Sequence, residues 1–213
     1  MRIGLDFDNT LATYDHVFAS AAQDHGFIGK STGAGKRSIR DRVRGLDDGE
    51  TKWQALQGEV YGKRMKDAAL IDGAGDFLRA CKRHGAEVFI VSHKTEYGHY
   101  DAARVNLRDA ARSWMTAHGF FDADGYGLDL GHVFFESTRP EKISRIGEIG
   151  CNFFVDDLEE VFAMPGFPDN VRRLLFDPSG MARPNTACEA HQSWQSIEAA
   201  VFTSGAHELR STR

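Results

Sequence analysis

Apolar runs alternate with amphipathic stretches along most of the chain. The apolar runs predict five strands, at about residues 2–7, 86–92, 133–135, 151–155 and 171–176. The amphipathic stretches predict helices, at about residues 73–84, 101–118, 140–148 and 194–202, with a short helix after residue 157. This alternation predicts an α/β fold, specifically a Rossmann-like, doubly wound parallel sheet with helices on both faces.

One segment, from residue 13 to residue 72, interrupts the alternation. It has no convincing strand pattern, whereas Tyr14–His25 and Glu50–Arg64 place apolar residues near helical spacing. We therefore predict a small all-helical domain at residues 13–72, inserted after the first strand. Residues 1–12 and 73–204 are predicted to form the core of the protein, and residues 205–213 are predicted to form a flexible tail.

Acidic pairs follow two of the predicted strands. Asp6 and Asp8 end the first apolar run, and Asp156 and Asp157 follow the run at residues 151–155. Ligands of open α/β sheets bind at the carboxyl ends of the strands, and clustered carboxylates resist ionising together unless a cation or a proton lies among them. If the two strands are neighbours, the four carboxylates suit a hard cation such as Mg²⁺. The alternative is that each pair caps the helix that follows it.

The motifs occur in an order that resembles the haloacid dehalogenase (HAD) superfamily of phosphohydrolases. The stretch Asp6-Phe7-Asp8-Asn9-Thr10 matches its DxDxT signature, and Asp156-Asp157 is similar to its acidic fourth motif. Ser92, which closes the strand at residues 86–92, and Lys142, ahead of the acidic strand, are similar to the two motifs between them. The resemblance spans most of the chain, and the inserted helical domain resembles a HAD cap of the first type.

The resemblance implies a Mg²⁺-dependent phosphatase that hydrolyses a small phosphomonoester, such as a sugar phosphate or a nucleotide, through an aspartyl-phosphate. Asp6 would be the nucleophile, and Asp8 would act as general acid and then general base. The family pattern assigns Mg²⁺ to Asp6, the backbone carbonyl of Asp8 and Asp157, with Asp156 behind them; the sequence alone leaves the order of Asp156 and Asp157 open. The residues implied for phosphate binding are Ser92, His93, Lys142, Asn9 and Thr10.

The carboxylate at position 8 favours phosphomonoester chemistry over the other reactions of the superfamily. The resemblance implies that dehalogenases and phosphonate-cleaving members lack this second aspartate and that transport ATPases carry threonine there. Two alternatives stay open. A phosphotransferase would pass the phosphoryl group from the same intermediate to an acceptor other than water, and a non-catalytic binding protein would keep the HAD fold without turnover. The intact acidic set argues against the non-catalytic alternative.

A run of basic residues in the inserted segment contrasts with the net charge of −5 of the whole chain. It includes Lys36, Arg37 and Arg40, and helical spacing would let one helix face present two of them together. We predict that these three side chains attract or hold an anionic substrate. The alternative is a solvated helix face, which is the usual role of a charge run.

The composition is that of a globular enzyme, with 41% hydrophobic and 27% charged residues. The acidic balance argues against binding to a nucleic-acid polymer, and no apolar stretch is long enough to span a membrane. The three cysteines form no CxxC motif, which indicates reduced thiols. We therefore expect a cytoplasmic protein without a signal peptide, whose partner is a small phosphorylated metabolite.

Overall fold

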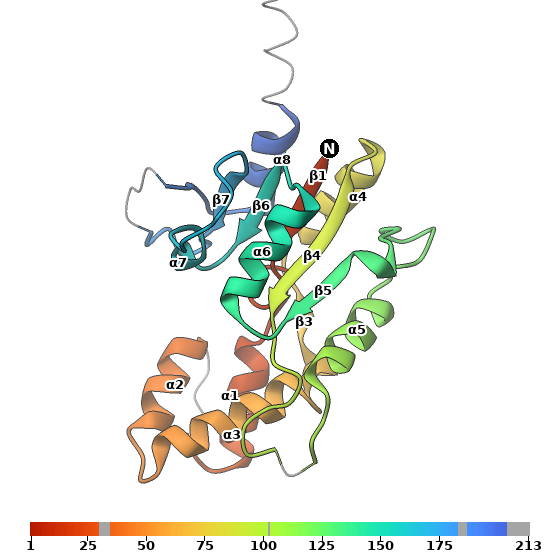
Figure 1. Ribbon diagram of the computed structural model, residues 1–213. Coiled ribbons are helices and arrows are strands. Elements are labelled where there is room, and N and C mark those ends of the chain that lie inside the picture. Colours follow the sequence, from red (N-terminus) through yellow and green to blue (C-terminus); the bar gives the residue numbers. More distant parts are fainter. Residues whose placement is uncertain (30–34, 102, 183–186, 204–213) are drawn as a thin grey trace, which may run out of the picture. The chain divides into compact units, whose positions relative to one another are not determined.

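The protein, seen in a computed structural model, divides into two compact units (Figure 1). The structure describes residues 1–29, 35–101, 103–182 and 187–203. The first unit, here the sheet unit, comprises Met1–Leu11, Leu70–His93 and Gly119–Arg213. The second, here the helical unit, comprises Ala12–Ala69 and Lys94–His118. The flexible tail predicted at residues 205–213 lies outside the described residues.

A six-stranded parallel sheet forms the centre of the sheet unit. Its strands are β1 (Arg2–Leu5), β4 (Glu87–His93), β5 (Val133–Glu136), β6 (Phe153–Asp156), β7 (Arg172–Phe176) and β8 (Glu189–His191). They lie in the order β5-β4-β1-β6-β7-β8, and every neighbouring pair is parallel. The predicted Rossmann-like sheet is therefore confirmed. The sequence does not predict β8, because this short edge strand carries one alanine between two polar residues and gives no apolar signal.

Helices cover both faces of this sheet (Figure 1). They are α4 (Ala74–Arg83), α6 (Arg139–Ile149), α7 (Glu159–Phe162) and α8 (Trp194–Phe202), with a 3-10 turn η2 (Leu130–His132) before β5. Leu175 of β7 belongs to the same buried cluster as Ile143 of α6. The next residue, Phe176, packs against Trp194 of α8 with ring centroids 5.5 Å apart. Because successive side chains of a strand point to opposite faces, α6 and α8 cover opposite faces.

Strand β1 lies near the middle of the sheet and is buried. Ile3 and Leu5 are fully buried, as expected for an apolar strand with a parallel neighbour on each side. Gly4 is needed for close packing, since a Cβ atom at this position would overlap the ring of Phe154 and lie 3.0 Å from Cys151 Sγ. The sequence of β1 thus brings its neighbour β6 into tight contact.

Helix α6 has clear start and stop signals. Its N-cap residue, Thr138, forms a capping box with Glu141, in which each side chain accepts a hydrogen bond from the other residue's backbone N–H. Pro140 lies in the first turn, where its fixed φ suits a helix. Gly150 ends the helix with a φ of 66°, a left-handed conformation that favours glycine. These caps fix the first turn of α6, which carries the buried Lys142.

The helical unit consists mainly of four helices. They are α1 (Asp15–Asp24), α2 (Lys36–Arg44), α3 (Gly49–Tyr61) and α5 (Leu107–Ala117), with a 3-10 turn η1 (Met65–Asp67). Two strands that the sequence does not predict, β2 (Ala12–Thr13) and β3 (Ala69–Leu70), form a small separate sheet. Phe18 of α1 stacks on Trp53 of α3 with ring centroids 5.0 Å apart.

Residues 94–118, which the sequence assigns to the core, cluster with the helical unit. Their helix α5 packs against α3 and η1. The indole N–H of Trp114 on α5 donates to the backbone carbonyl of Ala68 at 2.9 Å. The sequence pattern shows an amphipathic helix at this position but does not show which partner its apolar face has.

The described helices are all short. The longest among the described residues, α3, has 13 residues, whereas a transmembrane helix needs about 20 apolar residues. Within the described ranges, no helix has the length and apolar character needed to cross a bilayer.

The packing around Gly4 leads to a prediction about stability. Gly4→Ala should lower the free energy of unfolding by about 1–3 kcal/mol, because the added methyl group displaces the ring of Phe154 in a packed core. Thermal and urea unfolding measure the change. Gly29→Ala is the matched control, since no atom lies within 4 Å of a Cβ atom there, and it should leave stability unchanged or slightly raised. Equal effects of the two substitutions would contradict the prediction.

Candidate active site

Three carboxylates meet where β1 and β6 end. The two strands are neighbours, with Leu5 opposite Val155, and the backbone N–H of Asp6 donates to the Val155 carbonyl at 2.9 Å. Asp156 is the last residue of β6, and Asp157 follows it. One carboxylate oxygen from each of Asp6, Asp156 and Asp157 lies within 4.8 Å of the other two. The two strands are thus neighbours, and their acidic ends meet.

Lys142 joins two of these carboxylates. Its ammonium donates to Asp6 Oδ1 and to Asp156 Oδ2, each at 2.6 Å. The lysine is only 3% exposed. Burial disfavours the charged ammonium, but the two carboxylates outweigh this effect and raise the pKa of Lys142 above its usual range. Lys142 therefore stays positively charged at the centre of the acidic group.

Asp156 is the most buried of the three aspartates, with no exposed surface. Its Oδ1 accepts a hydrogen bond of 3.0 Å from the backbone N–H of Leu158, and its Oδ2 accepts from Lys142. Burial and the neighbouring Asp6 charge raise the pKa of Asp156 to about 7, although Lys142 favours the ionised form. A raised pKa is consistent with this geometry, because Lys142 divides its charge between two carboxylates.

The turn after β1 carries the other residues of the first motif. Asn9 has a φ of 60°, a left-handed conformation that asparagine tolerates better than most residues. This turn lets Thr10, which is fully buried, place its hydroxyl 3.5 Å from Asp157 Oδ1. Asp8 is half-buried, and its side chain is not one of the three that converge within 4.8 Å. The structure thus links the first and the fourth motif through Thr10.

Ser92 and His93 end the strand on the other side of β1. Strand β4 pairs with β1 so that Ile90 lies opposite Leu5, which brings the following residues to the same sheet edge as Asp6. Ser92 is 1% exposed. His93 Nε2 lies 3.1 Å from the carbonyl oxygen of Ser137. Partial burial and the nearby cations lower the pKa of His93, so its imidazole is neutral at pH 7.

The basic residues predicted to hold substrate lie in α2 of the helical unit, separate from the unit that carries the carboxylates. Lys36 Nζ donates to the hydroxyl of Tyr61 at 2.6 Å, and Arg40 pairs with Asp41 at 2.8 Å. Arg37 is exposed. Their role in substrate binding stays a prediction.

The cluster of three carboxylates is suited to binding a divalent cation. When ionised, the three aspartates and Lys142 together carry a net charge of −2. Carboxylate oxygens are the ligands that hard cations prefer. Opposite ligands of one Mg²⁺ lie roughly 4.2 Å apart, close to the 4.8 Å within which these oxygens lie. Asp6, Asp156 and Asp157 are thus the side chains that could hold such an ion.

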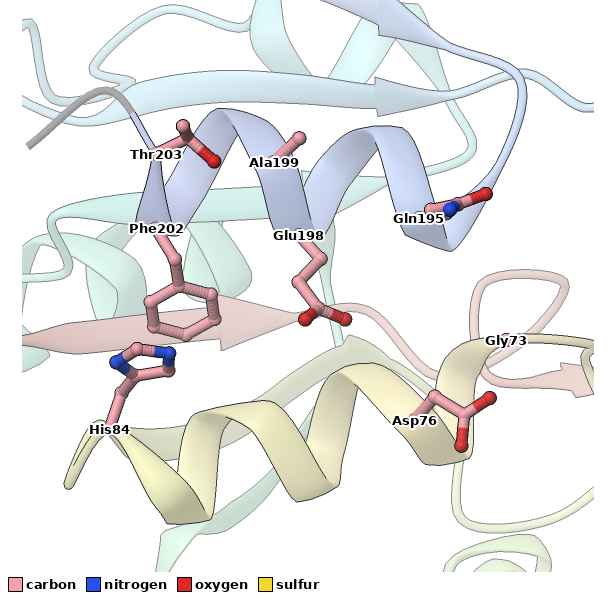
Figure 2. Close-up of a pocket in the computed structure, with 8 residues that line it drawn as sticks. All are labelled: Gly73, Asp76, His84, Gln195, Glu198, Ala199, Phe202 and Thr203. Carbon is pink, nitrogen blue, oxygen red and sulfur yellow. The ribbon is translucent and has the colours of Figure 1, made fainter. Parts of the chain in front are cut away.

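A separate groove of about 830 Å³ lies between α4 and α8 of the sheet unit (Figure 2). At one end of the groove, the ring of His84 stacks on Phe202 with centroids 4.4 Å apart. The lining residues are Gly73, Asp76, His84, Gln195, Glu198, Ala199, Phe202 and Thr203. None of them belongs to the predicted site, so the groove is not the place where the acidic motifs meet.

Comparison with known proteins finds similarity in structure only. No protein-family model and no curated protein matches the sequence. A HAD-superfamily hydrolase from Ehrlichia chaffeensis superposes with a TM-score of 0.55 at 13% identity, covering 95% of this chain and 96% of that one. An L-2-haloacid dehalogenase has a TM-score of 0.58 at 12% identity, covering 94% and 97%. The fold is that of the HAD-superfamily hydrolases.

The HAD fold accommodates more than one reaction, so it does not select the chemistry of this chain. A HAD family hydrolase from Deinococcus radiodurans, solved with bound phosphate and sodium, has a TM-score of 0.51 at 15% identity and covers 96% of both chains. The dehalogenase named above has the same fold. The reaction therefore depends on the side chains at the ends of β1, β4 and β6.

The raised pKa of Asp156 leads to a prediction for the metal-free protein. Folded Asp156 holds a proton up to about pH 7, whereas the unfolded side chain loses it near its ordinary value of 3.8. Between these values the folded state binds more protons, so stability falls as pH rises. In EDTA, raising the pH from about 5 to about 7.5 should lower the free energy of unfolding of the wild type by at least about 1 kcal/mol more than that of Asp156→Asn. In thermal unfolding, this difference corresponds to an extra fall in Tm of about 2–4 °C.

The matched control for this measurement is Asp169→Asn, because the Asp169 side chain is fully exposed. This variant should show the same pH dependence of Tm as wild type. If Tm depends on pH equally in Asp156→Asn and Asp169→Asn, then Asp156 does not hold a proton in the folded state at these pH values.

Proposed function

We propose that this protein is a Mg²⁺-dependent phosphatase that hydrolyses a small phosphomonoester through an aspartyl-phosphate on Asp6. The observation that supports this most directly is the ion group at the ends of β1 and β6, in which Lys142 bonds Asp6 and Asp156 beside Asp157. A negatively charged nucleophile must approach a negatively charged phosphate, so the site has to supply positive charge. The group combines a nucleophile, a fixed cation and ligands for a metal.

Asp6 is the nucleophile in this proposal. It is 5% exposed, and Lys142 holds its Oδ1, which orients the carboxylate and leaves Oδ2 for attack on phosphorus. The P–O bond to the leaving alcohol breaks as the bond to Asp6 forms. Water then hydrolyses the aspartyl-phosphate and regenerates the carboxylate.

Asp8 is the general acid and base. It follows Asp6 by two residues in the turn after β1, and it is half-buried. Asp8 would donate a proton to the leaving oxygen and then remove one from the attacking water. The resemblance implies that the superfamily's dehalogenases lack a carboxylate at this position, so Asp8 favours phosphomonoester hydrolysis over dehalogenation.

Lys142 and Ser92 stabilise the transferring phosphoryl group. Lys142 carries a fixed positive charge, and the buried Ser92 offers a hydroxyl donor at the same sheet edge. A Mg²⁺ ion held by Asp6, Asp157 and the carbonyl of Asp8 supplies Lewis-acid charge when bound. Asp156 holds Lys142 in place from the other side. Asn9, Thr10 and His93 complete the proposed phosphate-binding set.

The proposal predicts that Asp6→Asn abolishes turnover while the protein stays folded. An amide is a poor nucleophile and a poor metal ligand, so phosphate release from p-nitrophenyl phosphate should fall by about three orders of magnitude or more. EDTA should stop the wild-type reaction, and Mg²⁺ should restore it. Circular dichroism checks the fold. The exposed Asp169→Asn serves as the matched control and should keep the wild-type rate.

If Asp6→Asn keeps more than about a tenth of the wild-type rate, Asp6 is not the nucleophile. Such a rate corresponds to a rise in activation free energy of under about 1.4 kcal/mol. Full activity in EDTA would show that turnover does not require a metal ion. Product analysis with added alcohols distinguishes the phosphotransferase, which would form a new phosphate ester in place of inorganic phosphate.

A second prediction concerns Asp8. Removing the general acid matters most when the leaving oxygen is strongly basic. Asp8→Asn should therefore slow hydrolysis of an alkyl phosphate by about 100-fold or more, and it should slow p-nitrophenyl phosphate much less, because nitrophenolate leaves without a proton. Steady-state rates on both substrates give the ratio. An equal loss on the two substrates would contradict the role of Asp8 as general acid.

A further inference from the structure

The first residue of α6, Arg139, forms an ion pair with Glu160 of α7. Its Nη2 donates to Glu160 Oε1 at 3.3 Å. The pair lies on the surface, since the two side chains are 44% and 59% exposed. Exposed ion pairs of this kind add little to the stability of a fold. Stability alone therefore gives little reason for an arginine at this position.

Arg139 belongs to the edge of the sheet that carries the candidate active site. Strand β5 ends at Glu136, which lies opposite His93 of β4, and α6 begins three residues later. Arg139 and Lys142 are three residues apart in this helix, so they lie on the same helix face. The rise between them is about 4.5 Å. Arg139 thus lies one turn nearer to the start of α6 than the lysine that bonds Asp6.

The charge of Arg139 acts on the residue that follows Ser92. Partial burial is the main cause of the lowered pKa of His93, and the positive charges of Arg139 and Lys142 lower it further. His93 Nε2 lies 3.1 Å from the carbonyl oxygen of Ser137, which precedes Arg139 by two residues. Two cations of α6 and the end of β4 therefore share one edge of the sheet.

The partner of Arg139 in the structure is itself a carboxylate. Glu160 follows Asp157 by three residues, so both members of the pair lie close along the chain to members of the candidate active site. The contact uses one of the five N–H donors of the guanidinium. A carboxylate that approaches in the plane of the guanidinium accepts two parallel hydrogen bonds and is held more strongly. A carboxylate ligand can therefore replace Glu160 at little cost.

We propose that Arg139 is a specificity-determining residue that binds a carboxylate of the substrate, and that Glu160 competes with this carboxylate for the guanidinium. The substrate is then a small phosphomonoester that also carries a carboxylate. This inference rests on the proposed phosphatase function, in which Lys142 stabilises the phosphoryl group. Arg139 selects a second anionic group about one helical turn from that lysine.

Matched substrates test the inference. Phosphooxy carboxylates of increasing chain length are compared with the corresponding amides, which have the same shape but no charge. The kcat/KM of the best carboxylate should exceed that of its amide by about tenfold or more, mainly through KM, because the amide loses a charge-assisted hydrogen bond. Arg139→Gln should remove this preference by raising KM for the carboxylate. Arg139→Lys keeps the charge and should retain part of the preference.

The variant Glu160→Gln should have the opposite effect. Removing the competing carboxylate should raise kcat/KM for the phosphooxy carboxylate by about two- to fivefold. A purely structural ion pair would instead make Arg139→Gln and Glu160→Gln act in the same direction. Arg145→Gln is the matched control, because Arg145 lies on the same helix but pairs with Glu136 and Glu148. It should keep the wild-type preference, and circular dichroism checks the fold of every variant.

Equal kcat/KM for carboxylates and amides, or a preference that survives Arg139→Gln, would overturn the proposal. Failure of the phosphatase function gives a different result, because no phosphomonoester then releases phosphate. Isothermal titration calorimetry with Asp6→Asn measures the Kd of each compound without turnover. Carboxylates should bind more tightly than amides to this protein, and adding Arg139→Gln should remove the difference. Equal or undetectable binding of both compounds would overturn the proposal, whether or not the wild type is a phosphatase.

Discussion

A buried lysine shared by two buried aspartates is the interaction on which the candidate active site depends. Lys142 contacts Asp6 and Asp156 at the same distance of 2.6 Å. Such an ion group adds little net stability, because desolvation offsets much of the attraction. Removing one member is nonetheless costly, since it leaves a buried charge without compensation. The group therefore fixes the positions of the carboxylates more than it stabilises the fold.

The positions of the three partners come from three different kinds of local constraint. The central strand β1 presents Asp6, and β6 presents Asp156 beside it because the two strands are hydrogen-bonded neighbours. Helix α6 presents Lys142 because the Thr138 capping box and Gly150 fix both of its ends. A parallel sheet aligns its carboxyl ends along one edge. Precise placement of one ion group thus requires most of the sheet unit.

The sequence predicts most of this core because its signals are local. The apolar runs locate β1 and β6, and the Pro140 and Gly150 signals bound α6. The order of motifs, through its resemblance to the HAD superfamily, points to Asp6 and Lys142. The sequence does not show that Lys142 bonds two aspartates or that residues 94–118 pack with the inserted helices. Those facts depend on contacts between distant segments, which composition and periodicity do not encode.

The place of β1 in the sheet has a consequence for synthesis of the chain on the ribosome. Arg2 pairs with Glu87, and Ile3 pairs with Phe153, so β1 is made well before either of its partner strands. At about 5–20 residues per second, translation delivers the second partner roughly seven to thirty seconds after β1. Both edges of this apolar strand are open to other chains until β4 is made, and one edge stays open until β6 is made. The segment that carries the proposed nucleophile is therefore also the one that most needs protection from aggregation during synthesis.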